Sequence, residues 1–199
     1  MRKGKNILLV GVGGQGIILV SKVLTHGLVK AGYDVKMSEV HGMAQRGGNV
    51  STQVRYGDKI HSPNIGRGQA DILVAFERME AVRYAEFMRP DAIAVINDYA
   101  MIPMSVSSGS AVYPEHTIEA MAKAFKTVSL DAAQKAIELG NAKCMNMVLF
   151  GAMAEALQMD EIDWNEALSD VLPSKILDIN LKAFEAGRQI FDEKKAVVA

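Results

Sequence analysis

Cysteine is almost absent from this chain, which has one, Cys144, among 199 residues. One thiolate cannot hold an iron–sulfur cluster, close an internal disulfide or complete a thiol-based zinc site. Cys144 also lies in the apolar run 144–150. We expect it to be a buried thiol that packs as a small hydrophobic group, and a nucleophile is the less favoured alternative. If redox metal chemistry is involved at all, it is therefore expected outside this chain.

Excess charge and long apolar runs are also lacking. The 22 basic residues oppose 23 acidic ones, so no long-range field favours nucleic acid or an anionic membrane. No run reaches the roughly 18 apolar residues of a membrane helix, and glycines interrupt the apolar start before a signal peptide is complete. The 4 histidines show no metal-ligand spacing. We expect a cytoplasmic protein that binds no nucleic acid, membrane or metal.

The chain does contain a regular alternation of short apolar segments and helical patterns. With 49% apolar and 23% charged residues, it is typical of a globular protein, and we expect one domain over residues 1–199. Strands are predicted at residues 6–10, 34–38, 49–56, 71–76, 92–97 and 127–130. Helices are predicted at residues 15–30, 77–88, 115–125, 132–139, 142–157, 164–170 and 174–191.

This order predicts a three-layer α/β/α fold. It has a Rossmann-like strand–helix–strand start, a mostly parallel but mixed sheet, and a helical C-terminal flank. A hairpin is expected to turn at Gly57 and Asp58. Residues 39–48 are expected to form a loop, and 101–114 an irregular segment with a possible short strand at 111–113.

A glycine-rich turn follows the first predicted strand, with the sequence Gly-Val-Gly-Gly-Gln-Gly at residues 11–16. Gly11 would permit the tight turn, Gly13 would let an anion approach backbone N–H groups, and Gly16 would let the helix pack on the strand. Glu39, at the end of the second strand, could bind a ribose hydroxyl and complete an NAD or flavin site. The same glycines could serve the turn alone, and Glu39 could cap a helix or pair locally.

A second glycine-rich segment lies at the C-terminal end of the second predicted strand, where open α/β sheets bind ligands. Arg46, beside Gly47 and Gly48, could present a guanidinium and backbone N–H groups to a carboxylate or phosphate. His41 could carry a proton. Alternatively, Arg46 pairs with Glu39 and His41 satisfies a local hydrogen bond.

Three strings carry a resemblance to a known family: Gly-Val-Gly-Gly-Gln-Gly-Ile at residues 11–17, Glu-Val-His-Gly-Met-Ala-Gln-Arg-Gly-Gly at 39–48, and Asn-Ala-Lys-Cys-Met-Asn-Met at 141–147. The chain resembles the gamma subunit or domain of 2-oxoacid:ferredoxin oxidoreductases, and is most similar to the indolepyruvate branch. The resemblance extends over almost the whole chain. It implies a single pyruvate/ketoisovalerate oxidoreductase gamma-type domain at 1–199.

The resemblance implies a complex that decarboxylates a 2-oxoacid on thiamine diphosphate, passes electrons through iron–sulfur clusters to ferredoxin, and transfers the acyl group to coenzyme A. Larger partner subunits would hold thiamine diphosphate and the clusters, so this chain alone would bind no cofactor and supply no catalytic residue. Its own contribution would be to shape a subunit interface or the approach of coenzyme A, through Gly11, Gly13, Gly14, Gln15, Gly16, Glu39, His41, Gln45, Arg46, Gly47 and Gly48. A stand-alone NAD or flavin oxidoreductase and an anion-sensing module remain alternatives.

Overall fold

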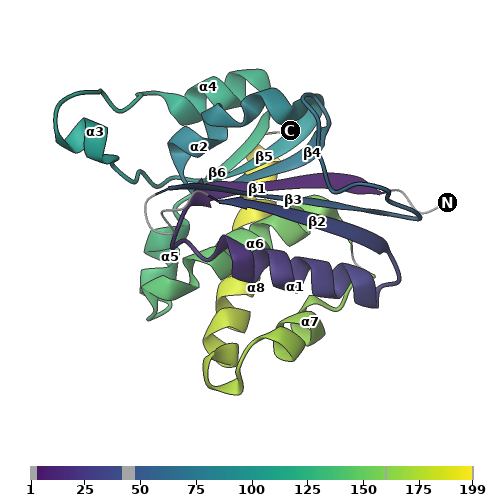
Figure 1. Ribbon diagram of the computed structural model, residues 1–199. Coiled ribbons are helices and arrows are strands. Elements are labelled where there is room, and N and C mark those ends of the chain that lie inside the picture. Colours follow the sequence, from purple (N-terminus) through teal and green to yellow (C-terminus); the bar gives the residue numbers. More distant parts are fainter. Residues whose placement is uncertain (1–3, 42–47, 160, 199) are drawn as a thin grey trace.

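Six strands form one mixed sheet in the computed structural model, which describes residues 4–41, 48–159 and 161–198 (Figure 1). For His41 and residues 195–198 it describes the backbone alone. The strand order is β2-β3-β1-β4-β5-β6, and β3 alone runs antiparallel to its neighbours. The strands are β1 (Lys5–Val12), β2 (Asp34–His41), β3 (Asn49–Gly57), β4 (Ala70–Ala75), β5 (Met88–Asn97) and β6 (Lys126–Leu130).

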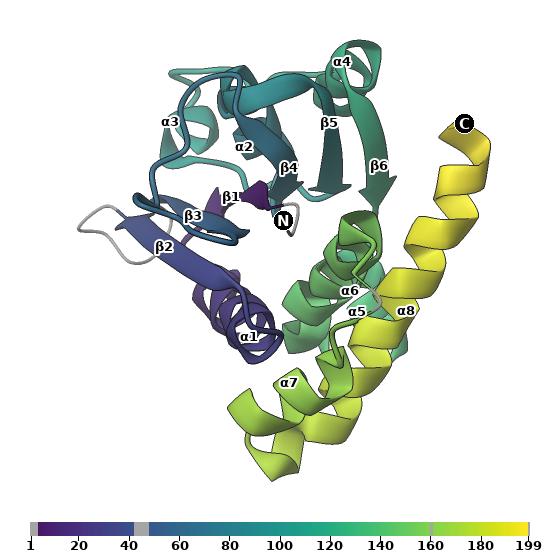
Figure 2. The same ribbon diagram turned by 90° about the vertical axis from the view of Figure 1, so that its right-hand side faces the viewer.

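Helices cover both faces of the sheet, as Figures 1 and 2 show. One face carries α2 (Arg78–Arg83) and α4 (Thr117–Ala124), with α3 (Met104–Ser107) in a connection that projects from the body. The other face carries α1 (Ile17–Lys30), α5 (Ala132–Glu138), α6 (Met145–Leu157), α7 (Trp164–Val171) and α8 (Ser174–Val198). Single 3₁₀ turns lie at Ala85–Phe87 and Ala142–Cys144. The expected three-layer fold with a helical C-terminal flank is confirmed.

The central strand β1 explains why both layers are stable. Successive side chains of a strand point to opposite faces. Ile7 and Leu9 therefore pack into the core beneath α1 and α6, whereas Leu8 and Val10 pack into the smaller core beneath α2 and α4. All four are at most 1% exposed. A strand that is buried on both faces has a continuous apolar sequence, and the sequence of β1 has this pattern.

The position of β3 differs from the prediction. The hairpin expected at Gly57 and Asp58 does not form, because β3 pairs with β2 on one edge and with β1 on the other. Lys5 lies opposite Tyr56 in one ladder, and Asp34 lies opposite Gly57 in the other. Two full ladders satisfy the backbone groups of β3 along its length, which a two-residue partner strand could not do. As a result, β2 is not adjacent to β1.

Three element boundaries also differ. β2 continues to His41, so the predicted loop begins later than residue 39. The helix expected at 77–88 ends early, and β5 begins at Met88 and includes Pro90. The β4–β5 register shifts at this end of the strand, where a missing N–H is tolerated. The short strand expected at 111–113 is absent from the described structure, and α3 was not predicted.

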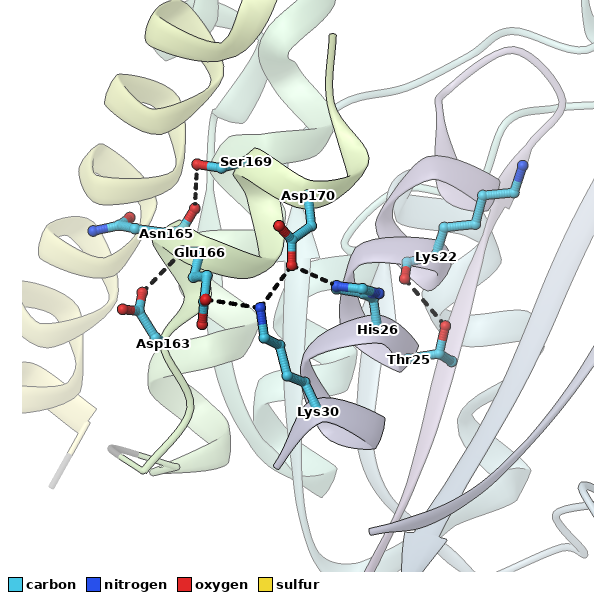
Figure 3. A network of polar contacts seen from close by, with 9 residues as sticks. All are labelled: Lys22, Thr25, His26, Lys30, Asp163, Asn165, Glu166, Ser169 and Asp170. Carbon is cyan, nitrogen blue, oxygen red and sulfur yellow. Dashed lines mark hydrogen bonds and ion pairs between the residues drawn. The ribbon is translucent and has the colours of Figure 1, made fainter. Parts of the chain in front are cut away.

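Exposed ion pairs connect α1 with α7 (Figure 3). Lys30 Nζ lies 2.8 Å from both Asp170 Oδ2 and Glu166 Oε1, and His26 Nε2 lies 2.9 Å from Asp170 Oδ2. Such exposed pairs orient the helices more than they stabilise the fold. Within the described ranges, no helix is long and apolar enough to cross a membrane.

Candidate functional site

The glycine-rich turn joins the end of β1 at Val12 to the start of α1 at Ile17. Gly14 and Gly16 have φ angles of 102° and 80°, a region that glycine adopts without steric cost. Gly11 has a different role from the predicted one, because it lies inside β1. A Cβ atom added there would lie 2.8 Å from Cβ of Phe76. Gly11 is therefore required by close packing rather than by the turn.

Gln15 closes the turn from the inside. Its Oε1 accepts a hydrogen bond from the N–H of Val12 at 2.7 Å, and its Nε2 donates to the carbonyl of Phe76 at 2.9 Å. The Gln15 N–H donates to the Val12 carbonyl at 3.2 Å. The residue is 7% exposed, so its amide is satisfied by protein groups. The glutamine of this turn therefore has a structural role.

The predicted anion-binding amide of Gly13 is used within the chain. Its N–H donates to the carbonyl of Gly48 at 2.9 Å, which joins the first turn to the end of the second glycine-rich segment. The N–H groups of Ile17 and Ile18, at the start of α1, have no acceptor within the residues the structure describes. The same holds for the N–H groups of Gly14 and Gly16 in the turn, so four backbone N–H groups remain for an external acceptor.

A cavity of about 330 Å³ opens at this turn. Backbone and apolar side chains line it, among them Val12, Ile17, Ile18 and Val50. Ile18 is 42% exposed, and Val40 on β2 is 55% exposed. Exposed apolar side chains beside a closed turn suit a partner surface better than a strongly charged ligand.

The third string meets the first one here. Asn146 Nδ2 donates to the carbonyl of Gly16 at 3.3 Å. Asn141 accepts a hydrogen bond from the N–H of Lys143 at 3.0 Å and begins the 3₁₀ turn before α6. Cys144 is 2% exposed, and burial raises the pKa of its thiol. Parts of all three strings thus surround the start of α1.

Glu39 lies in β2, opposite Thr52 of β3, and accepts a hydrogen bond from Ser21 Oγ of α1 at 3.3 Å. Because β3 intervenes, Glu39 is two strand spacings, roughly 9.5 Å, from β1. A dinucleotide site places its acid on the strand next to the glycine turn. His41 ends β2, and its side chain lies outside the described part. Gln45, Arg46 and Gly47 also lie outside the described residues, so their predicted roles stay predictions.

A buried carboxylate that was not predicted from the sequence organises the same edge of the sheet. Glu77 is 0% exposed and accepts hydrogen bonds from the N–H groups of Met79 and Glu80 at 2.7 and 3.1 Å, which caps α2. Its Oε1 accepts from the N–H of Met101 at 3.2 Å and from the Tyr113 hydroxyl. One carboxylate therefore holds both ends of segment 101–113. An acid between a buried strand and a helix was the available signal.

Asn97 was also missed. It is 0% exposed and follows the apolar run of β5. Its Nδ2 donates to the carbonyl of Phe76 at 3.2 Å, the same oxygen that Gln15 binds, and its Oδ1 accepts from the N–H of Ala132 at 3.0 Å. Asn97 thus connects the turn region to the start of α5.

The residues present do not fit an iron–sulfur cluster. Such clusters are held by several thiolates, and the chain has a single cysteine, whose thiol is buried. Across the described ranges there is no group of three or more His, Cys, Asp or Glu side chains arranged to hold a metal ion. No step through such a group is assigned to this chain.

Comparisons with known proteins agree over nearly the whole chain. The model of the pyruvate ferredoxin/flavodoxin oxidoreductase family matches residues 6–190. Indolepyruvate oxidoreductase subunit IorB of Thermococcus kodakarensis is 36% identical over 193 residues, which cover 93% of this chain and 95% of that protein. The Archaeoglobus fulgidus subunit of the same name is 38% identical over 189 residues, or 92% of each chain. 2-oxoglutarate synthase subunit KorC of Methanothermobacter thermautotrophicus is 28% identical, with 95% of this chain and 96% of that protein covered.

Solved structures share the fold. The gamma subunit of a keto/oxoacid ferredoxin oxidoreductase from Geobacter sulfurreducens has a TM-score of 0.70 at 20% identity, covering 95% of this chain and 99% of that one. A 2-oxoglutarate:ferredoxin oxidoreductase chain from Magnetococcus marinus has a TM-score of 0.74 at 22% identity, covering 97% of this chain but 32% of that longer one. The chain therefore belongs to the pyruvate ferredoxin/flavodoxin oxidoreductase family, as a small, gamma-type subunit of the multi-subunit 2-oxoacid:ferredoxin oxidoreductases.

Proposed function

We propose that this chain is the small subunit of an aryl-pyruvate:ferredoxin oxidoreductase, with indolepyruvate as the representative substrate. The complex would convert a 2-oxoacid and coenzyme A into an acyl-coenzyme A and carbon dioxide, and two electrons would pass to ferredoxin. The higher identity to the indolepyruvate subunits, 36 to 38%, than to the 2-oxoglutarate subunit, 28%, supports the aryl substrate. The expected cytoplasmic location is part of the proposal.

Thiamine diphosphate and the iron–sulfur clusters belong, in this proposal, to a larger partner subunit. The single buried cysteine of this chain supports that division, because a cluster needs several thiolates. When bound to the partner, thiamine diphosphate supplies the decarboxylation chemistry. This chain contributes a rigid surface beside it.

The observation that carries the proposal is the closed glycine turn. The N–H groups of Val12, Gly13 and Gln15 are all bonded within the chain, so the turn keeps its shape without a ligand. The part of the turn that another molecule can reach is the cavity beside Ile18, at the start of α1. We infer that this edge, with the segment that contains Gln45, Arg46 and Gly47, meets the partner subunit or borders the path of coenzyme A.

A stand-alone NAD or flavin enzyme is not favoured. Its acid, Glu39, is bonded to Ser21 and separated from the turn by β3. An anion-sensing module would depend on the N–H groups of Gly14, Gly16, Ile17 and Ile18, because Gly13 is already bonded to Gly48, and the exposed Ile18 beside them suits a protein surface better than an anion.

The test is reconstitution with the larger subunit that copurifies with this chain from its native source. Aryl-pyruvate-dependent reduction of ferredoxin in the presence of coenzyme A should require both proteins, and the isolated chain should be inactive. Calorimetry of the isolated chain with NAD should detect no binding. Full activity of the larger subunit alone, or a micromolar dissociation constant for NAD, would reverse the proposal.

A further inference from the structure

A second and larger cavity, of about 750 Å³, lies between α2 and segment 101–112. This volume falls within the range of pockets that bind small molecules. Most of the lining is apolar, and three methionines contribute to it, Met79, Met101 and Met104. Methionine side chains are adaptable and make favourable contacts with aromatic rings. The walls therefore suit an aromatic group.

The cavity contains two ionisable side chains, Glu80 and Arg83, within the residues the structure describes. Arg83 Nε donates to Glu80 Oε1 at 3.1 Å, and the Arg83 side chain is half exposed. Neither Nη atom of Arg83 has a hydrogen bond to a described residue. The outer end of the guanidinium is thus left with donors that match a carboxylate.

Glu80 orients this guanidinium from a buried position. It is 2% exposed, and burial raises the pKa of its carboxyl group while Arg83 lowers it. Its Oε2 has no hydrogen-bond partner in the described structure. Glu80 is therefore a positioning residue for Arg83, and the exposed charge at the cavity belongs to the arginine.

We propose that this cavity binds a small aromatic carboxylate, with the ring against the methionine-rich walls and the carboxylate on the Nη atoms of Arg83. Arylacetates and aryl-pyruvates share this chemistry. The inference goes beyond the proposed function, because it assigns a ligand to this chain alone. Val12 lines both this cavity and the one at the glycine turn, so the two openings are neighbours.

The segment that covers the cavity is held in place by Glu77. Met101 and Tyr113, at its two ends, both donate to Glu77 Oε1. Met104 and Val112 on this segment are 82% and 88% exposed, so apolar surface is available to a ligand from this side. The cover is anchored at both ends before a ligand arrives, which reduces the entropy cost of binding.

The first experiment is calorimetry of the isolated chain with indole-3-acetate at low salt. Indole-3-acetamide, which has the same ring and no charge, is the matched ligand. The carboxylate should bind about tenfold more tightly or better, because a charge-assisted pair is lost with the amide. Equal binding of the two ligands, or no binding of the carboxylate at millimolar concentration, would overturn the proposal.

The second experiment uses variants. Arg83→Gln should weaken indole-3-acetate binding about tenfold and leave indole-3-acetamide unchanged. Arg67→Gln is the control, because Arg67 is an exposed arginine outside the cavity that pairs with Glu86 at 3.2 Å. Glu80→Gln keeps an oxygen that can accept from Arg83 Nε, and should retain binding. If Arg83→Gln loses its circular dichroism spectrum, Arg83→Met, which also removes the charge, replaces it, and undiminished binding by a folded variant would contradict the assignment.

A third comparison separates aromatic from aliphatic carboxylates. 4-Methylpentanoate has a carboxylate and a branched alkyl group, and should bind more weakly than indole-3-acetate. Equal affinity would overturn the aromatic part of the inference. Since none of these measurements needs the partner subunit, a negative result here leaves the reconstitution test of the proposed function intact.

Discussion

The side-chain amide of Asn146 donates a hydrogen bond to the carbonyl oxygen of Gly16 at 3.3 Å, across 130 residues of sequence. Gly16 adopts a φ angle of 80°, and a Cβ atom added to it would lie 2.4 Å from Asn146 Nδ2. Two of the strings that carry the family resemblance therefore meet in one contact. This contact sets the start of α1 against the start of α6.

Gly16→Ala should lower the free energy of unfolding by about 1 to 3 kcal/mol, through backbone strain and displacement of Asn146. Gly14→Ala is the control, because Gly14 also has positive φ but has no atom within 4 Å of the added Cβ. It should show the strain alone. Urea unfolding of both variants measures the difference, and equal losses would show that the Asn146 contact adds nothing.

Gly151 and Gly187 allow α6 and α8 to pack at close range. A Cβ at Gly151 would lie 1.9 Å from the carbonyl oxygen of Phe184, and one at Gly187 would lie 1.9 Å from that of Val148. Backbone atoms cannot rotate away, so Gly151→Ala should force the helices apart and cost about 2 kcal/mol or more despite the better helix propensity of alanine. Thermal unfolding measures the loss. Lys182→Ala, at an exposed position of α8, should change stability by less than about 0.5 kcal/mol.

Tyr113→Phe should loosen one end of the segment over the larger cavity, because its hydroxyl donates to the buried carboxylate of Glu77. We expect a loss of about 1 kcal/mol and faster hydrogen exchange at the N–H of Met101, which shares the same acceptor. Tyr99→Phe is the matched control, since the Tyr99 hydroxyl has no hydrogen bond to a described residue. Unchanged exchange at Met101 in Tyr113→Phe would show that the two ends are held independently.

Asp170 should make stability depend on acid pH. Hydrogen bonds from Lys30 and His26 hold the pKa of its carboxyl group below the usual value. A lowered folded-state pKa stabilises the protein above the unfolded-state pKa, near 4, and this stabilisation is lost as pH falls through the folded-state pKa. Asp170→Asn should therefore melt at a lower temperature than the parent at neutral pH, and the two should converge in strong acid.

The control for this prediction is ionic strength, because the pairs in Figure 3 are exposed. Salt should narrow the difference between Asp170→Asn and the parent at neutral pH. A difference that persists unchanged in strong acid would show that the substitution perturbs packing rather than charge.

Arg46→Ala should leave the stability of the isolated chain within about 0.5 kcal/mol, as for a surface position without special features. In the reconstituted complex it should weaken subunit affinity, or the step that uses coenzyme A, by about ten to a hundredfold through loss of a charge-assisted pair. Arg46→Lys keeps the positive charge but lacks the planar guanidinium, so it should retain part of the affinity or activity that Arg46→Ala loses. A large loss of stability in the isolated chain would instead favour a structural pair with Glu39.

The amino-acid sequence by itself determined the elements and their order. The apolar run at the start predicted a buried strand, and the observed β1 extends from Lys5 to Val12 around it. Helical periodicity likewise predicted α1, whose last residue is Lys30 as expected. These patterns are local, because a strand or helix buries side chains at intervals of a few residues. The three short strings were also enough to indicate the family.

Only the tertiary structure decided how those elements meet. The insertion of β3 between β1 and β2, the contact between Gly16 and Asn146, and the cavity beside Arg83 all join segments that are distant in the sequence. No sequence pattern around Glu77 predicts that its carboxylate binds Met101 and Tyr113. The folded surroundings select the partners of buried polar groups, and the neighbours of a strand depend on which pairing satisfies its backbone hydrogen bonds. These choices leave no periodic pattern in the sequence.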